Sequence, residues 1–141
     1  MRLLRVFRRR EHGQALVEFS MVAIVFFILV FGMIDVGRAV WNYNTLAQAT
    51  REGTRYAIVH GADSTTPTGP VDDSAVVTEV QKFTAGLNLS QLAVQATWPD
   101  GSNASGSSVT VTSQYAYEPI FNFLGIISFN MTSSSTMEIT N

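Results

Sequence analysis

Gly13 and Glu18 stand at the start of a long apolar segment, and their types and spacing suggest chemistry. A carboxylate at the edge of an apolar helix is costly unless it is neutralised or paired. Within its own helix, Glu18 has no cation C-terminal to it before Arg38. A cut between Gly13 and Gln14 would place a new α-amine at the height of Glu18 on a neighbouring copy. Glu18 therefore needs a partner from outside its own helix, and an α-amine of this kind would give Glu18 a role in assembly.

The segment after Glu18 has the composition of a membrane helix. The 16 residues from Phe19 to Ile34 carry no charge, and five of the nine basic residues precede Gly13. Because basic residues are retained on the cytoplasmic side, we expect a single-pass protein of the inner membrane, N-terminus in and C-terminus out. The stretch from Met33 to Arg38 lacks the small-residue pattern of a secretory cleavage site, so the helix should stay attached.

Composition limits what the rest of the chain can do. The protein has 141 residues and no cysteine, so the exported part must be held by packing and not by disulfides. Residues 14–141 contain four basic and ten acidic residues, a net charge of −6. Such a chain offers no basic patch for phosphates, and we expect no nucleic-acid partner.

The absence of proline before Pro67 predicts one continuous helix over residues 14–60, with residues 14–41 as the membrane and assembly segment. Trp41 and Tyr43 would lie in an outer aromatic belt. A stripe of mostly small residues should seat the globular domain: Leu46, Ala49, Gly53 and Ala57. Other side chains should face water: Asn42, Asn44, Gln48, Thr50, Arg51, Glu52 and Arg55. His60 and Gly61 should form the last turn and its C-cap.

Residues 61–141 predict a small exported α+β domain. A turn-rich linker over 61–74 leads into a short helix with an apolar face of Val76, Val77, Val80, Phe83 and Leu87. Alternation then predicts three antiparallel strands near 92–98, 109–117 and 129–140, the first two joined as a hairpin. The apolar run 118–129 should start a short helix at Pro119, and either plugs the core or contacts another subunit.

No set of residues suggests catalysis. His12 would be lost if the chain is cut after Gly13, and His60 lies at a helix end with no nucleophile pattern around it. The run Asp100 to Asn103 has turn chemistry but lacks the ligand spacing of a calcium loop. We therefore expect no enzyme, no cofactor and no metal site.

Two resemblances add to this interpretation. Gly13, the five residues ending in Glu18 and the apolar run resemble the processing site of type IV pilin-like proteins. Two further runs resemble the TadE-like family of tight-adherence pilus proteins: Ile34-Asp35-Val36-Gly37-Arg38 and Ala49-Thr50-Arg51-Glu52-Gly53-Thr54-Arg55-Tyr56-Ala57. The resemblance implies a leader over 1–13 that a prepilin peptidase removes, and a pilin-like fold. It also implies that the motif residues serve assembly: Asp35, Arg38, Arg51, Glu52, Gly53 and Arg55.

The family resemblance further implies the partners and the destination. These are copies of the chain or related pilins, the prepilin peptidase, the inner-membrane assembly machinery and membrane lipid, followed by an extracellular adhesive filament. Asp35 and Arg38, one turn apart, can pair with each other. The competing hypothesis is a permanently anchored, exported binding module, in which Glu18 lies among lipid headgroups and Met1 is retained.

Overall fold

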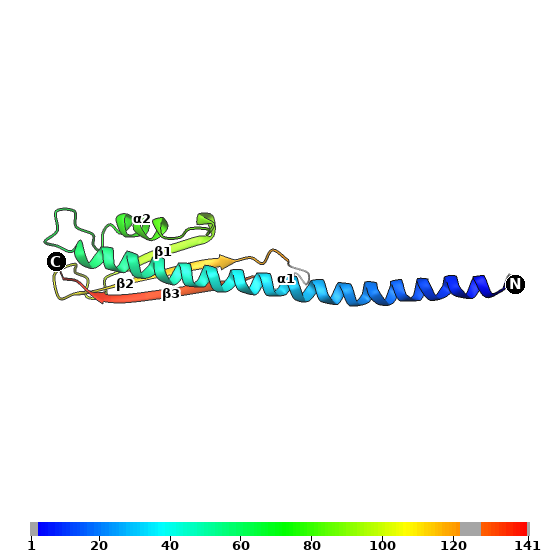
Figure 1. Ribbon diagram of the computed structural model, residues 1–141. Coiled ribbons are helices and arrows are strands. Elements are labelled where there is room, and N and C mark those ends of the chain that lie inside the picture. Colours follow the sequence, from blue (N-terminus) through cyan, green and yellow to red (C-terminus); the bar gives the residue numbers. More distant parts are fainter. Residues whose placement is uncertain (1–2, 122–127, 141) are drawn as a thin grey trace. The chain divides into compact units, whose positions relative to one another are not determined.

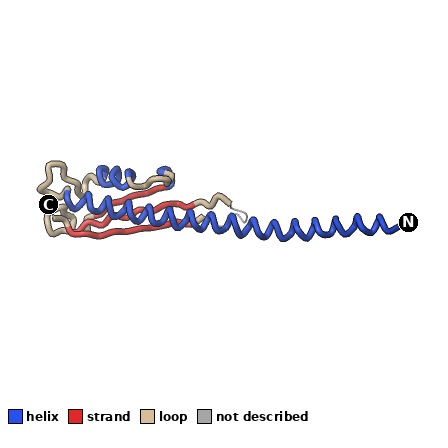
Figure 2. Tube along the Cα trace, viewed as in Figure 1, coloured by secondary structure: helices blue, strands red, loops and turns tan. Residues whose placement is uncertain are grey.

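The computed structural model describes residues 3–121 and 128–140, with residues 3–12 as helical backbone only. Helix α1 runs from Leu3 to Val59 and is followed by helix α2 (Ser74–Lys82) and a 3-10 turn, η1 (Leu89–Gln91). Three strands complete the chain: β1 (Leu92–Thr97), β2 (Ser108–Tyr117) and β3 (Phe129–Glu138). Figures 1 and 2 show this order along the chain. The predicted α+β fold, with a long N-terminal helix, one short helix and a three-stranded antiparallel sheet, is confirmed.

The chain forms two compact units that divide between Gly37 and Arg38. In the second unit the strand order is β1-β2-β3, and both pairs are antiparallel. The register places Leu92 opposite Tyr115, and Tyr117 opposite Phe129. The predicted hairpin between β1 and β2 is therefore confirmed.

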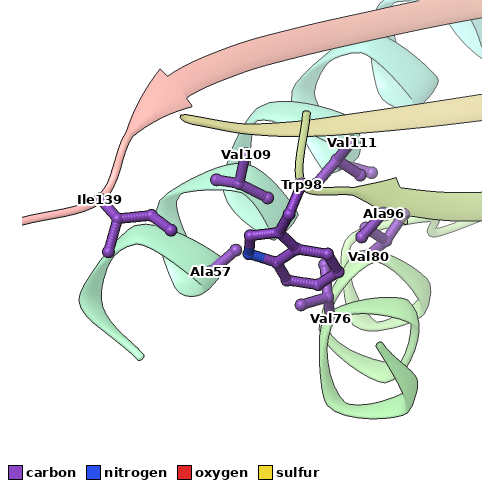
Figure 3. Close-up of a cluster of buried hydrophobic side chains, with 9 residues drawn as sticks. Ala57, Val76, Val80, Ala96, Trp98, Val109, Val111 and Ile139 are labelled. Atoms are coloured by element: carbon purple, nitrogen blue, oxygen red, sulfur yellow. The ribbon is translucent and has the colours of Figure 1, made fainter. Parts of the chain in front are cut away.

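Both helices of the second unit cover the same face of the sheet. One core cluster joins α1, α2 and all three strand regions around Trp98 (Figure 3): Ala49, Ala57, Val76, Val80, Ala96, Val109, Val111 and Ile139. A second cluster consists of Leu46, Leu87, Tyr115, Tyr117 and Met131. Alternating strand residues supply the inward side chains, as the period of two in their sequences predicts.

The other face of the sheet is rich in hydroxyl groups. Thr110 and Thr136 share a hydrogen bond of 2.8 Å across β2 and β3, and Thr112 and Ser134 share one of 3.1 Å. Thr97 adds a bond of 3.3 Å from β1 to the carbonyl of Thr110. Neutral hydroxyl groups thus link the three strands on this face.

The stripe of mostly small residues on α1 is buried as predicted, and Gly53 shows why small size is needed there. A Cβ atom at Gly53 would overlap Cγ2 of Val80 on α2 and would lie 3.8 Å from Val111 on β2. Close contact of α2 with α1 therefore depends on the missing side chain.

Two residues predicted to face water are buried instead. Asn42 is 3% exposed and Thr50 is fully buried. The Thr50 hydroxyl donates to the carbonyl of Leu46 at 2.7 Å, so the helix itself satisfies this polar group. Such a threonine packs on its methyl side and can join an otherwise apolar stripe.

Helix ends also differ from expectation. The glycines with positive φ among the described residues are Gly86, Gly101 and Gly106, so Gly61 does not cap α1 in the left-handed conformation. The backbone nitrogen and the hydroxyl of Thr68 donate to the carbonyl of His60 instead, at 2.7 and 3.1 Å. Thr68, in the linker after α1, thus caps the C-terminal end of the helix.

Two aromatic residues lie near the surface, and the first of them, Phe83, was predicted to be on the packed face of the short helix. Phe83 follows the last residue of α2 and is 41% exposed, because the helical period no longer applies there. Phe129, at the first position of β3, is 44% exposed and packs against the Tyr117 ring at 5.3 Å. Residues 118–121 do not start the helix predicted at Pro119, and residues 122–127 lie outside the described part.

Candidate functional site

The candidate site is α1 itself, which carries every predicted processing and assembly residue. From Leu16 to Val36 its large apolar side chains are mostly exposed; Met33, at 76%, is the most exposed of them. By length and composition this helix can cross a membrane. A helix that is apolar on all sides needs lipid or protein around it. The apolar surface of the first unit therefore requires contact with lipid or protein.

Glu18 has a neutral partner within the chain. Nε2 of Gln14 donates a hydrogen bond of 3.0 Å to Oε1 of Glu18, one helical turn away, and both side chains are exposed. Gly13 is exposed as well, and no atom would meet a Cβ at this position within 4 Å. The structure thus brings Gln14 and Glu18 together. A charged partner from another copy, as predicted for Glu18, stays a prediction.

Arg38 begins the second unit and contacts the end of β2. Its Nη1 donates to the carbonyl of Glu118 at 3.4 Å, and its guanidinium carbon lies 5.6 Å from the centre of the Tyr117 ring. A cation over an aromatic face is attracted by the ring quadrupole. Arg38 therefore joins the helix to the chain segment after β2. The predicted pairing with Asp35 stays a prediction.

The run from Arg51 to Arg55 divides between two sides of α1. Gly53 faces Val80 in the core, whereas Arg51 and Arg55 are exposed. Arg55 Nη1 lies 3.7 Å from Glu52 Oε1, and the two side chains are 68% and 31% exposed. Gly53 therefore serves the fold of the single chain. The charged residues remain available on the surface for the predicted assembly role.

His60 behaves as a residue at a helix end. Its Nδ1 lies 2.8 Å from the carbonyl oxygen of Tyr56, and its ring stacks on Tyr56 with centroids 3.9 Å apart. Among the described residues, no group of three or more His, Asp or Glu side chains could hold a metal ion. The Asp100 region is a turn, in which Oδ2 of Asp100 accepts from the Ser108 nitrogen at 2.8 Å.

Sequence reasoning missed Tyr117 and Glu118 as partners of Arg38. Alternation in β2 indicates that Tyr117 points inward, but no local pattern reveals which helical residue it meets.

Residues 13–55 match the TadE-like protein family. The TadE-like segment begins at Gly13, contains Gln14 and Glu18 and the whole run from Ile34 to Arg38, and ends at Arg55, two residues before the end of the second run. The suspected resemblance is therefore confirmed, and it relates the chain to Tad pilus proteins, whose TadE-like members are structural components. No curated protein and no solved structure matches the chain. The sheet and α2 lie outside the TadE-like segment.

Proposed function

We propose that this protein is a structural subunit, a pilin or a minor pseudopilin, of a Tad-type surface filament that serves adhesion. A prepilin peptidase removes residues 1–13, and the trimmed subunit leaves the inner membrane to join a polymer of itself or of related pilins. The match of the TadE-like segment to the exposed apolar part of α1 is the observation that carries this proposal.

The exposed helix supports both stages of this life cycle. In the membrane, lipid covers the side chains between Leu16 and Val36. In a filament, the same side chains pack against the helices of neighbouring subunits, so they stay out of water in both environments. The inner-membrane assembly machinery transfers the subunit between these two environments. The same apolar surface of α1 thus contacts lipid first and the helices of neighbouring subunits afterwards.

Charged groups determine the orientation of the chain in the membrane and the register between adjacent subunits. The leader arginines hold the N-terminus in the cytoplasm, so the second unit folds outside. After the cut, the α-amine at Gln14 of one subunit pairs with Glu18 of the next. An unpaired carboxylate and an unpaired amine are each costly between packed helices, and an in-register pair relieves both. The pair therefore selects subunits at the correct height.

The intact mass of the full chain tests this function. Protein is purified from membranes and from sheared surface filaments of the same cells. A mass that begins at Gln14 in both fractions supports the pilin function. A mass that begins at Met1 everywhere, with no polypeptide of this sequence in filaments, contradicts it and favours the permanently anchored binding module.

A further inference from the structure

Exposed apolar side chains of the second unit gather at one end of its sheet. We name them the apolar rim, and their exposed fractions lie between 44% for Phe129 and 67% for Trp41; the rim comprises Trp41, Tyr43, Leu89, Ile120 and Phe129. Among the described residues, the other large exposed apolar side chains of this unit are Val40 on α1, Phe83 directly after α2, and Val59 and Val71 at the opposite end, where α1 terminates.

Strand register and side-chain contacts place these residues together. Phe129 pairs with Tyr117, and Ile120 follows Tyr117 by three residues. Leu89 opens η1, directly before the strand whose first residue, Leu92, lies opposite Tyr115. Arg38 contacts Glu118, which brings the first turn of α1 in this unit to the same end of the sheet.

The two rim aromatics on α1 point to opposite sides of the helix. Asn42, which lies between them in sequence, is 3% exposed and faces the sheet. Because successive helical residues turn by about 100°, Trp41 and Tyr43 project to either side of the buried Asn42. The helix therefore carries one large amphipathic side chain on each side of Asn42.

The short chain between the apolar run and the second unit limits how far the rim can lie from the membrane. Three residues separate Ile34, the last of the apolar run, from Arg38, and a chain of this length spans at most about 14 Å. The headgroup layer on each side of a bilayer is itself about 5 to 8 Å thick. Tryptophan and tyrosine favour this layer, because their rings are apolar and their N–H and O–H groups can meet water.

We propose that the apolar rim rests in the headgroup layer on the outer side of the membrane that holds the apolar run. This inference rests on the membrane stage of the proposed function. A second copy in the same membrane presents its own rim toward the same bilayer, so lipid is the surface that every rim meets. Leu89, Ile120 and Phe129 then fix the second unit on the membrane, with the hydroxyl-rich face of the sheet left to solvent.

The lack of cysteine makes a site-specific test direct. Single-cysteine variants of the full chain, Leu89→Cys and Ile120→Cys, receive an environment-sensitive fluorophore and are placed one per nanodisc. Parallel phosphatidylcholine discs include either a lipid with a shallow quenching group, which reports on positions 71, 89 and 120, or a lipid with a deep quenching group, which reports on position 27. Val71→Cys, at a side chain that is fully exposed, is the distal control. Phe27→Cys, within the apolar run, is the anchor control.

The expected result is a blue-shifted emission and a clear loss of intensity at positions 89 and 120, with little change at position 71. Quenching at 89 and 120 no stronger than at 71, while position 27 is quenched, overturns the rim proposal and leaves the anchored subunit standing. Absence of quenching at position 27 overturns the membrane stage and the rim together. Shielding that arises only with two copies per disc assigns the rim to a second copy and overturns the lipid assignment.

A second measurement excludes insertion driven by the label itself. The Ile120→Cys label is examined in a background that also carries Leu89→Ser and Phe129→Ser. Quenching of the label should fall, because two of the side chains that hold the unit on lipid are gone. The matched control, Val59→Ser at the far end, should leave it unchanged. Equal quenching in both backgrounds counts against the rim.

Discussion

The side-chain amide of Gln14 donates a 3.0 Å hydrogen bond to the carboxylate of Glu18. In the uncut chain, the carboxylate that directly precedes the apolar run is therefore bound by a neutral side chain one turn away. A cut after Gly13 would add an α-amine to that same neighbour. Gln14, which donates a hydrogen bond to Glu18 within one chain, would then carry a cation that could pair with Glu18 of another chain.

Replacement of Gly13 by leucine should block processing. The peptidase implied by the family resemblance accepts a small residue before the cut, and an uncut leader would draw its arginines into hydrocarbon at about 2.5 to 3.5 kcal/mol each. Precursor should accumulate in membranes and filaments should disappear, as measured by intact mass and electron microscopy. Gly32→Leu is the matched control, since a Cβ there also meets nothing within 4 Å. Normal trimming of Gly13→Leu would move the cut elsewhere.

The substitution Glu18→Gln should leave insertion and cleavage intact and reduce assembly. The glutamine keeps the shape but cannot attract the α-amine of the next subunit. The measurement is the ratio of surface polymer to membrane monomer. Ser20→Ala serves as control, because the Ser20 hydroxyl bonds the carbonyl of Leu16 in its own helix. An unchanged ratio with correctly trimmed Glu18→Gln protein would refute the pairing.

Alanine at Gly53 should destabilise the second unit. Its methyl group overlaps Val80, and strain from overpacking costs about 1 to 3 kcal/mol. The gain in helix propensity, about 1 kcal/mol, offsets part of this cost. Thermal unfolding followed by circular dichroism should show a lower midpoint. In the Val80→Ala background the loss should shrink, because the overlapping methyl groups are gone; equal losses in both backgrounds would contradict the contact.

Arg38→Gln should loosen the chain segment that follows β2. The change removes a cation over Tyr117, an interaction worth about 0.5 to 1 kcal/mol at exposed sites. Amide hydrogen exchange at residues 118–121 should become faster, while protection in β1 stays the same. Arg55→Gln is the control, since its exposed pair with Glu52 contributes little. Unaltered exchange at 118–121 in Arg38→Gln would argue against the connection.

The carboxylate of Asp72, in the turn before α2, should become protonated at a lower pH than the carboxylate of an ordinary aspartate. Hydrogen bonds from the Ser74 side chain and then its backbone nitrogen lower the pKa of Asp72 below 3.8. A lowered folded pKa contributes stability that is present above the unfolded value and is lost as pH falls through the folded one. A nuclear magnetic resonance titration should show the Asp72 pKa move upward in Ser74→Ala. A fixed pKa would exclude the Ser74 hydroxyl as its cause.

Local patterns predicted the elements of the fold because each has a simple physical period. The alternation in Val109 and Val111 requires a strand with one buried face, and the stripe through Ala49, Gly53 and Ala57 requires a helix packed closely. Thr50 was misjudged because its hydroxyl is satisfied by its own helix, which a polarity pattern does not register.

Contacts between distant parts of the chain lay beyond such patterns. Thr68 closes the end of α1 from eight positions away, and Arg38 meets Glu118 across 80 positions. These pairings depend on how the whole second unit closes. The proposed roles of Gly13 and Glu18, in contrast, depend on a local run of residues and on its resemblance to pilin-like processing sites, and they stay predictions.

The hydroxyl pairs that join β2 and β3, Thr110 with Thr136 and Thr112 with Ser134, determine how the sheet responds to salt. Hydrogen bonds between neutral groups are not screened by dissolved salt, unlike ion pairs between exposed charges. Beyond Lys82 the chain also contains no lysine or arginine, so trypsin-like proteases find no bond to cut in any strand. The sheet should therefore be less sensitive to salt and to trypsin-like proteases than a charged, lysine-rich sheet would be.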